Sequence, residues 1–207
     1  MEKRRIVLMD FDGVIANSFG QLYEINRLAG IEVNKNLSKN DYLELFKGNI
    51  HQKIKEFVGE DDMVIKKFTE FKYKIFSEYY NEKQVSLFDF SVNMIKELAN
   101  TAELVIISSA PGDSISRILK KNKIDSYFTG VVGINKDGKR ASIAKYKDNN
   151  NKLYFVTDTV GDLAEVQGLN ITSFGVTWGF HNEVDLLSMN PSFLINDYSE
   201  LVKIVSE

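Results

Sequence analysis

Short apolar runs alternate with helical patterns over most of the chain. Four runs are rich in Val, Ile and Phe and lead into turn or helix-start signals, which predicts buried strands at residues 5–9, 103–107, 152–157 and 173–178. Two weaker runs predict further strands at residues 129–134 and 192–196. Because helical patterns separate most of these runs, we expect a parallel α/β sheet.

Residues 17–83 break this alternation. The segment lacks strand-like runs, and its apolar side chains recur at helical spacing. One such stripe consists of Phe68, Phe71, Ile75 and Tyr79. Glycines at positions 30, 48 and 59 would divide the segment into three or four helices. The pattern therefore predicts a small helical domain at 17–83, inserted into an α/β core formed by residues 1–16 and 84–207.

The composition is typical of a globular protein with one sizeable core. Of the 207 residues, 43% are hydrophobic and 27% are charged. The net charge of −3 leaves no basic excess for phosphate contacts, so we expect no nucleic-acid partner. The absence of cysteine excludes disulfides, thiolate nucleophiles and zinc–thiolate sites, and two histidines are too few for a His-rich metal site.

The first residues, MEKRRIVLMDFDG, do not form a signal peptide, because Asp10 interrupts their short apolar run. No other apolar run approaches membrane-spanning length. We therefore expect a cytoplasmic protein without a membrane partner. Its oligomeric state is not determined by the sequence.

Polar side chains follow three of the predicted strands. The first strand leads into Asp10, the second into Ser108 and the third into Asp158. Ligands of open α/β sheets bind beyond the carboxyl ends of the strands, so these side chains would converge if the strands are neighbours. Asp12 follows two residues after Asp10, and Gly13 permits a tight turn there. One carboxylate could attack phosphorus while the other handles protons.

A cluster of carboxylates at this edge would need positive charge. Asp158 and Asp162 lie four residues apart across a strand-to-helix turn, and beside Asp10 they would repel one another. A hard cation with oxygen ligands, most simply Mg²⁺, would relieve this repulsion. A lysine should add further charge. Lys136, Lys139 and Lys145 are the candidates, and we favour Lys139 because it precedes a helix-like stretch.

These segments resemble the motifs of the haloacid dehalogenase-like hydrolase superfamily, over essentially the whole chain. DFDGVIANS resembles the first motif, in which the first Asp is the nucleophile and the second the general acid/base. VIISSAP resembles the second motif, GKRASI the lysine-bearing third, and VTDTVGDL the acidic fourth. The resemblance implies a Rossmann-like parallel sheet core with an inserted α-helical cap of the phosphoglycolate phosphatase and β-phosphoglucomutase type.

The resemblance also implies roles for the matching residues. Asp10 would attack phosphorus, and Asp12 would protonate the leaving alcohol and later activate water. Ser108 and Lys139 would hold the phosphoryl group. Mg²⁺ would be bound by Asp10, the backbone carbonyl of Asp12 and Asp158, with Asp162 assisting directly or through water.

The sequence departs from the family pattern in the third and fourth motifs. Thr157 and Thr159 flank Asp158 where Gly-Asp-Ser is common, which keeps the carboxylate and changes the turn. The third motif lacks the common Lys-Pro pair, so the assignment of Lys139 depends on spacing and on the apolar residue that follows. Asp12 disfavours dehalogenation, because members that cleave carbon–halogen bonds lack an acid there.

Further substrate contacts are expected from the cap and from the second motif. Asn49 and His51 lie near a predicted turn between cap helices and could read the substrate beyond its phosphate, although a lone histidine is more often a surface or packing residue. Ser109 could be a second phosphate contact or merely a polar residue before Pro111.

Each acidic motif by itself has an ordinary structural reading. Asp-Gly pairs and aspartates before helices are common turn and capping residues, so DFDG or TDTVGD alone would predict only a turn. Four such signals in family order, with the two acidic motifs and the serine after buried strands, favour an active site.

The expected protein is therefore a Mg²⁺-dependent phosphatase that hydrolyses a small phosphorylated metabolite through an aspartyl-phosphate on Asp10. One alternative is a phosphomutase, which would return the phosphoryl group to its substrate. A second alternative is a non-catalytic phospho-accepting module similar to a receiver domain. Receivers have their acidic pair before the acceptor Asp and lack a helical insertion, so the order of motifs disfavours this alternative.

Overall fold

The computed structural model describes residues 3–48, 50–133 and 138–207. Its centre is a parallel six-stranded sheet within these residues, in the order β5-β4-β1-β6-β7-β8. The strands are β1 (Arg4–Met9), β4 (Glu103–Ile107), β5 (Phe128–Val132), β6 (Asn151–Thr157), β7 (Thr172–Val176) and β8 (Phe193–Ile195). The structure thus confirms the parallel α/β sheet. The predicted strand at 173–178 ends earlier, and Trp178 instead donates its indole N–H to the carbonyl of Val14 (3.1 Å).

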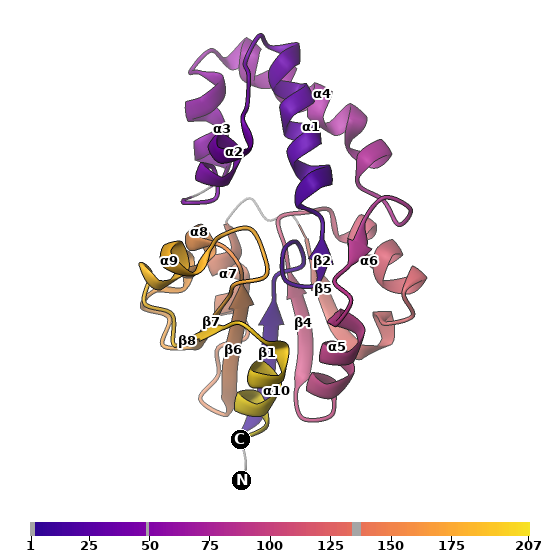
Figure 1. Ribbon diagram of the computed structural model, residues 1–207. Coiled ribbons are helices and arrows are strands. Elements are labelled where there is room, and N and C mark those ends of the chain that lie inside the picture. The colour runs from indigo at the N-terminus through magenta and orange to yellow at the C-terminus, as the bar shows by residue number, and fades with distance from the viewer. Residues whose placement is uncertain (1–2, 49, 134–137) are drawn as a thin grey trace.

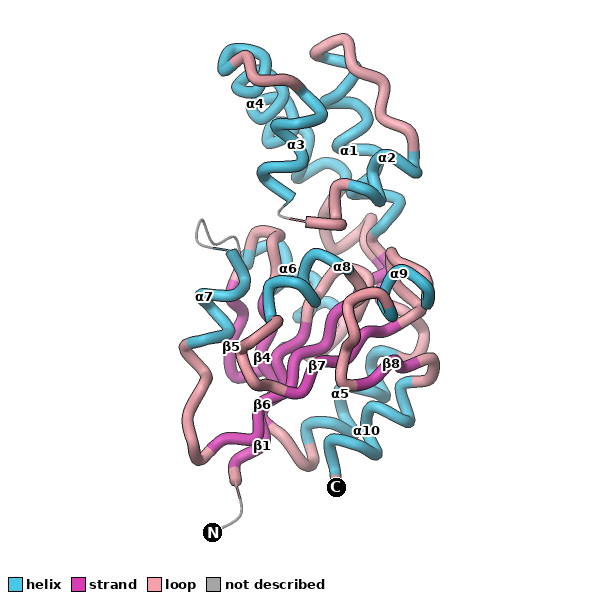
Figure 2. Tube along the Cα trace, turned by 90° about the vertical axis from the view of Figure 1, so that its left-hand side faces the viewer, coloured by secondary structure: helices cyan, strands magenta, loops and turns pink. Residues whose placement is uncertain are grey.

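Helices cover both faces of the sheet (Figures 1 and 2). One face packs against α5 (Ser91–Ala99), α6 (Gly112–Lys121) and α10 (Tyr198–Ser206), and the other against α7 (Gly138–Ala144) and α8 (Val160–Val166). The strands have two apolar faces for this reason: in β1, Val7 and Met9 join the first core and Ile6 and Leu8 the second. A 3₁₀ turn at Asp125–Tyr127 and the short helix α9 (Glu183–Leu187) complete this sheet unit.

A second group of helices lies beyond the carboxyl ends of the strands, at the top of Figure 1. This helical unit consists of α1 (Phe19–Glu32), α2 (Lys39–Glu44), α3 (Ile50–Val58) and α4 (Asp62–Tyr79). A short antiparallel pair, β2 (Ala16–Asn17) and β3 (Ser86–Leu87), connects it to the sheet unit. The sequence did not predict this pair, because two residues are too few for a strand pattern.

The helical unit has its own apolar core, in which α1 packs along α4. The predicted stripe of α4 faces inward, and its residues Phe68 and Ile75 are buried. Gly48 and Gly59 lie between helices as expected. Gly30 does not end a helix, because α1 continues to Glu32. Lys35 approaches so closely here that a Cβ on Gly30 would lie 2.9 Å from its carbonyl oxygen.

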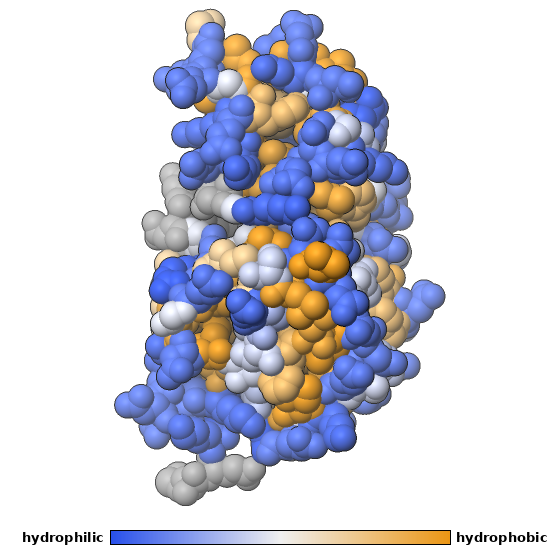
Figure 3. All heavy atoms as spheres, turned by 60° about the vertical axis from the view of Figure 1, so that its left-hand side comes forward, coloured by the Kyte–Doolittle hydropathy of each residue, from blue (hydrophilic) through white to orange (hydrophobic). Residues whose placement is uncertain are grey.

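Hydrophilic residues cover much of the face shown in Figure 3, with apolar patches between them on both units. No helix in the described part of the chain is both long enough and apolar enough to cross a membrane.

Candidate active site

The order of the strands brings the three predicted strand-end residues together. β1 lies between β4 and β6, and Asp10, Ser108 and Asp158 are each the first residue after one of these strands. All three are buried, with exposed fractions of 6%, 4% and 0%. Connections leave the sheet in opposite directions at such a point in an open parallel sheet, which opens a crevice there.

A tight turn after β1 places the two carboxylates of the first motif. The backbone N–H of Phe11 donates to Oδ1 of Asp10 (2.7 Å), and the N–H of Gly13 donates to the carbonyl of Ala16 (2.8 Å). Gly13 has a φ of +76°, and a Cβ there would lie 1.8 Å from Oδ2 of Asp158. Only glycine therefore allows this turn to approach the carboxylate of Asp158.

The carboxylate of Asp12 is held by two hydroxyl groups. Ser18 donates to Oδ1 of Asp12 at 2.5 Å, and Tyr80 donates to the same oxygen at 2.7 Å. Tyr80 is fully buried and follows directly after α4, so this contact connects the helical unit to the first motif. Burial raises the pKa of Asp12, while both hydroxyl groups oppose the rise.

Lys139 bridges two of the acidic motifs. Its Nζ lies 2.5 Å from Oδ2 of Asp10 and 2.5 Å from Oδ2 of Asp162, and its side chain is buried at the start of α7. Asp162 also accepts a hydrogen bond from the hydroxyl of Thr157 (2.9 Å). Of the other candidate lysines, Lys145 is exposed and Lys136 lies outside the described residues.

The pKa shifts at this site are those expected for one buried ammonium group, that of Lys139, among several buried carboxylates. Burial alone would lower the pKa of Lys139, but the carboxylates of Asp10 and Asp162 outweigh it, and the pKa is raised. Burial raises the pKa of Asp10 well above its ordinary value, against the opposing charge of Lys139. Burial alone would raise the pKa of Asp162, but the ammonium group of Lys139 and the hydrogen bonds to the carboxylate together outweigh it, so this pKa is lowered. Burial also raises the pKa of Asp158 to about 7, despite the hydrogen bond from the backbone N–H of Phe180.

The donor set fits a hard divalent cation. Oδ1 of Asp158 is buried and has no hydrogen-bond donor among the described residues, although its Oδ2 accepts from Phe180 at 2.7 Å. No three His, Cys, Asp or Glu side chains of residues 3–48, 50–133 and 138–207 come together as a ready metal cluster. Two carboxylates and a backbone carbonyl would still provide the oxygen ligands that Mg²⁺ prefers, with water completing the shell. Positive charge there would also stabilise the buried carboxylates.

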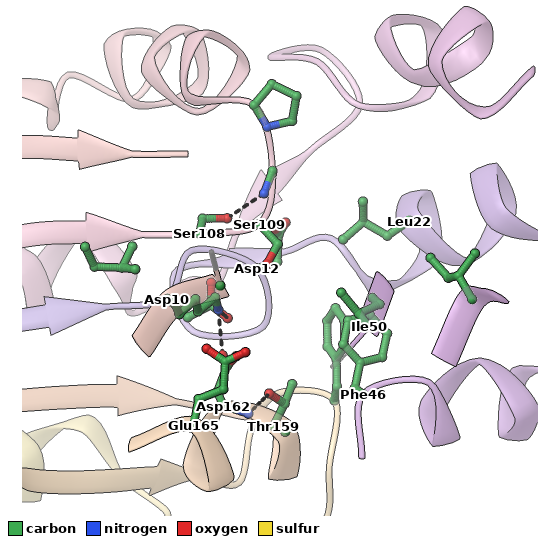
Figure 4. Close-up of a pocket in the computed structure, with 18 of the residues that line it drawn as sticks. Asp10, Asp12, Leu22, Phe46, Ile50, Ser108, Ser109, Thr159, Asp162 and Glu165 are labelled. Carbon is green, nitrogen blue, oxygen red and sulfur yellow. Dashed lines mark hydrogen bonds and ion pairs between the residues drawn. The ribbon is translucent and has the colours of Figure 1, made fainter. Parts of the chain in front are cut away.

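A cavity of about 150 Å³ opens beside these residues, between the sheet unit and the helical unit. Figure 4 shows its two sides: Asp10, Asp12, Ser108 and Asp162 lie opposite Leu22, Phe46 and Ile50. A space of this size holds a molecule about as large as benzene. The site therefore suits a small substrate.

Several direct contacts hold the helical unit over the cavity. The ring of Phe180, beside Asp158, packs edge-on against Phe46 (centroids 5.2 Å apart). The backbone N–H of Gly161 donates to the carbonyl of Phe46 (2.7 Å). His181 is buried and accepts from the N–H of Val160 through Nδ1 (2.9 Å), so its Nε2 carries the proton that faces the carbonyl of Leu43 (3.1 Å).

The structure brings Asp10, Asp12, Ser108, Lys139, Asp158 and Asp162 to one site. Ser108 accepts a hydrogen bond from the N–H of Ala110 (3.0 Å), and Ser109 is exposed at the edge of the cavity. Asn49 lies outside the described residues, and His51 lies in α3 with a side chain that is not described.

Tyr80, Asn26 and Lys72 also reach this site, from the helical unit, and no motif in the sequence predicted them. The sequence contains a signal for Lys72: it lies four residues from both Phe68 and Phe76, so a lysine interrupts an apolar row of α4. No local pattern indicates Tyr80, which meets Asp12 across 68 positions of the chain.

Comparison with known proteins places the chain in a family of hydrolases. The sequence model of the haloacid dehalogenase-like hydrolase family matches residues 7–176. The chain belongs to this family. The resemblance to this family, inferred from the sequence, is thereby confirmed.

Curated relatives include phosphoglycolate phosphatases. The enzyme of Vibrio parahaemolyticus serotype O3:K6 is 23% identical over 111 residues, which cover 50% of this chain and 49% of the relative. That of Mannheimia succiniciproducens is 23% identical over 148 residues, which cover 63% of each chain. The chain thus spans between about half and two thirds of the length of these relatives.

Solved structures share the whole fold. A predicted phosphatase from Clostridium acetobutylicum has a TM-score of 0.80 at 17% identity, with 99% of each chain covered. A haloacid dehalogenase-like hydrolase from Streptococcus pneumoniae has a TM-score of 0.78 at 14% identity, with 97% of this chain and 98% of the other covered. At these identities the likeness concerns the fold.

Proposed function

We propose that the protein is a phosphatase that hydrolyses a small phosphate monoester through an aspartyl-phosphate on Asp10. The observation that carries this proposal is the buried contact of Lys139 with Asp10 and Asp162, at 2.5 Å each, at one end of a cavity that Asp12 and Ser108 also line. Nucleophile, acid and phosphate-binding groups thus face the same small space.

The first step transfers the phosphoryl group. The carboxylate of Asp10 attacks phosphorus, the bond to the ester oxygen breaks, and Asp12 gives its proton to the leaving alcohol. Lys139 and Ser108 bind the phosphoryl oxygens, and their placement reduces the reorganisation that the transition state requires. Ser18 and Tyr80 hold the carboxylate of Asp12 in place during this transfer.

The second step releases phosphate. Asp12, now ionised, takes a proton from a water molecule, and this water attacks phosphorus of the aspartyl-phosphate. The bond between phosphorus and the Asp10 oxygen breaks, which restores the carboxylate and forms inorganic phosphate. Atoms and charge balance with water as the sole second reactant.

Asp10, the backbone carbonyl of Asp12 and Asp158 would hold Mg²⁺, with Asp162 assisting directly or through water. The unpaired Oδ1 of Asp158 supports this ligand set. A bound Mg²⁺ would neutralise charge on the phosphoryl oxygens and between the carboxylates. We assign residues 17–83 to a cap domain that excludes water from the cavity, with residues 1–16 and 84–207 as the catalytic core.

Phosphate release from a panel of monoesters tests this function. The purified protein should release inorganic phosphate from at least one small ester with Mg²⁺, and chelation by EDTA should stop the release. Formation of an isomeric phosphate ester without inorganic phosphate would instead indicate a mutase. A long-lived phosphoprotein without turnover would indicate a phospho-accepting module.

A further inference from the structure

The helical-unit side of the cavity contains one positive charge in largely apolar surroundings. Leu22, Phe46, Ile50 and Phe76 line this side, and Lys72 of α4 lines it with them. Among the described residues of the helical unit that line the cavity, Lys72 is the one charged side chain. No hydrogen bond or ion pair joins its ammonium group to another described residue.

The environment of Lys72 differs from that of its neighbours on α4. Lys72 is half-buried, whereas Lys74 is exposed to solvent, and Lys66 of the same helix forms an exposed pair with Glu70. Burial lowers the pKa of Lys72 to about 8. An unpaired ammonium group in an apolar wall is destabilising unless an anion joins it.

Asn26 provides an independent sign that this side binds a polar ligand. Its side chain is buried with an exposed fraction of 3%, and it lines the same cavity from α1. The amide nitrogen donates to the carbonyl of Leu22 (2.7 Å), while Oδ1 has no donor among the described residues. A buried acceptor without a donor costs stability, so a hydrogen-bond donor of the ligand or a bound water would satisfy it.

We propose that Lys72 and Asn26 form a subsite for the leaving group, and that Lys72 selects phosphate monoesters whose leaving group carries a carboxylate. This inference rests on the proposed phosphatase function. The phosphoryl group would occupy the end of the cavity beside Asp10 and Lys139, and the carboxylate would meet the ammonium group of Lys72. Asn26 would accept from a hydroxyl group or water beside the carboxylate.

Charge and volume favour a carboxylate over a second phosphate. Lys72 provides a single positive charge, which balances one carboxylate but not a phosphate dianion. The cavity of about 150 Å³ must also hold the first phosphoryl group, which leaves room for only a few further atoms. The relatives named phosphoglycolate phosphatases would take an ester of this chemical class, in which one methylene group separates the carboxylate from the ester oxygen.

A matched pair of substrates tests the subsite. Phosphoglycolate and 2-hydroxyethyl phosphate have the same skeleton, with a carboxylate in the first and a neutral hydroxymethyl group in the second. Wild-type protein should show a kcat/KM about 10- to 100-fold higher for phosphoglycolate, as expected for a hydrogen bond to a charged group. K72M should remove this preference, mainly through KM, and leave hydrolysis of the neutral ester within about twofold.

Two further variants separate charge from structure. K72R keeps the positive charge and should restore part of the preference, whereas K74M, two residues along the same helix on its exposed surface, should behave as wild type. Equal losses for both esters in K72M would show a structural role and overturn the subsite. An unchanged preference in K72M would overturn it as well.

The outcomes for the two proposals are distinguishable. If wild type hydrolyses the neutral ester as well as phosphoglycolate, the phosphatase function stands and the subsite is refuted. If it hydrolyses no ester with Mg²⁺, the phosphatase function fails and the subsite fails with it.

Discussion

The two sides of the cavity differ in how their polar groups are satisfied. On the sheet side, Lys139 pairs with two carboxylates, and Asp12 accepts two hydroxyl hydrogen bonds. On the helical side, the Lys72 ammonium and the Asn26 carbonyl have no partner among the described residues. The polar groups of the first side are already paired with one another, as a preorganised catalytic site requires, whereas those of the second side are left for a ligand to satisfy. In our proposal, chemistry and selectivity therefore belong to different units of the chain.

Substitution of the nucleophile should have the largest effect. D10N keeps the size of the side chain but removes the attacking carboxylate, so phosphate release should fall by at least about a thousandfold. Lys139 keeps its contact with Asp162, and we expect a folded protein by circular dichroism. D113N, an exposed aspartate on α6, should retain full activity. Substantial turnover by D10N would refute the aspartyl-phosphate mechanism.

Substitution of Lys139 should cause the second-largest loss of activity. K139M removes the charge shared by Asp10 and Asp162, and kcat should decrease about 100- to 1000-fold because a phosphoryl-binding group is lost. K145M replaces an exposed lysine nearby and is the matched control. Steady-state kinetics on the best ester would measure both. Equal activity of K139M and K145M would exclude Lys139 from the site.

Substitution of Tyr80 tests whether a residue that enters the site from the helical side affects catalysis as well as selectivity. Its hydroxyl group reaches Asp12 from the end of α4, so Y80F should lower kcat about tenfold on both members of the matched ester pair. Y79F at the neighbouring position is the control. If Y80F changed only the preference between the two esters, Tyr80 would belong to the selective side.

Gly161 lies where the sheet unit contacts the helical unit, and its substitution should have the smallest effect on catalysis. A Cβ there would lie 2.6 Å from the carbonyl oxygens of Phe46 and Gly48. The added methyl group of G161A should therefore push the backbone at Phe46 and Gly48 away from α8. We expect KM to rise a few-fold and the free energy of unfolding to fall by about 1–3 kcal/mol in urea titrations. G20A in α1, where an added Cβ meets nothing within 4 Å, should be neutral or slightly stabilising. Equal behaviour of both variants would refute the contact.

The sequence alone determined the sheet strands, the helical insertion and the residues at the strand ends. Buried parallel strands are apolar on both faces, so their runs are visible within five to seven residues of sequence. Asp10, Ser108 and Asp158 could be identified for the same reason, since each directly follows such a run. The fine structure was less visible: glycine at position 30 suggested a helix end, but packing of α1 along α4 carries the helix past it.

Only the tertiary structure decided which of these residues meet. Local patterns extend over a few turns or pleats, whereas the order of strands depends on packing across the whole sheet, and that order places β1 between β4 and β6. Of the two candidate lysines that the structure describes, Lys139 is buried against Asp10 and Asp162, whereas Lys145 is exposed. Asn26 and Lys72 line the cavity, and Tyr80 contacts Asp12, only because the helical unit lies over the carboxyl ends of the strands. No local periodicity encodes this arrangement.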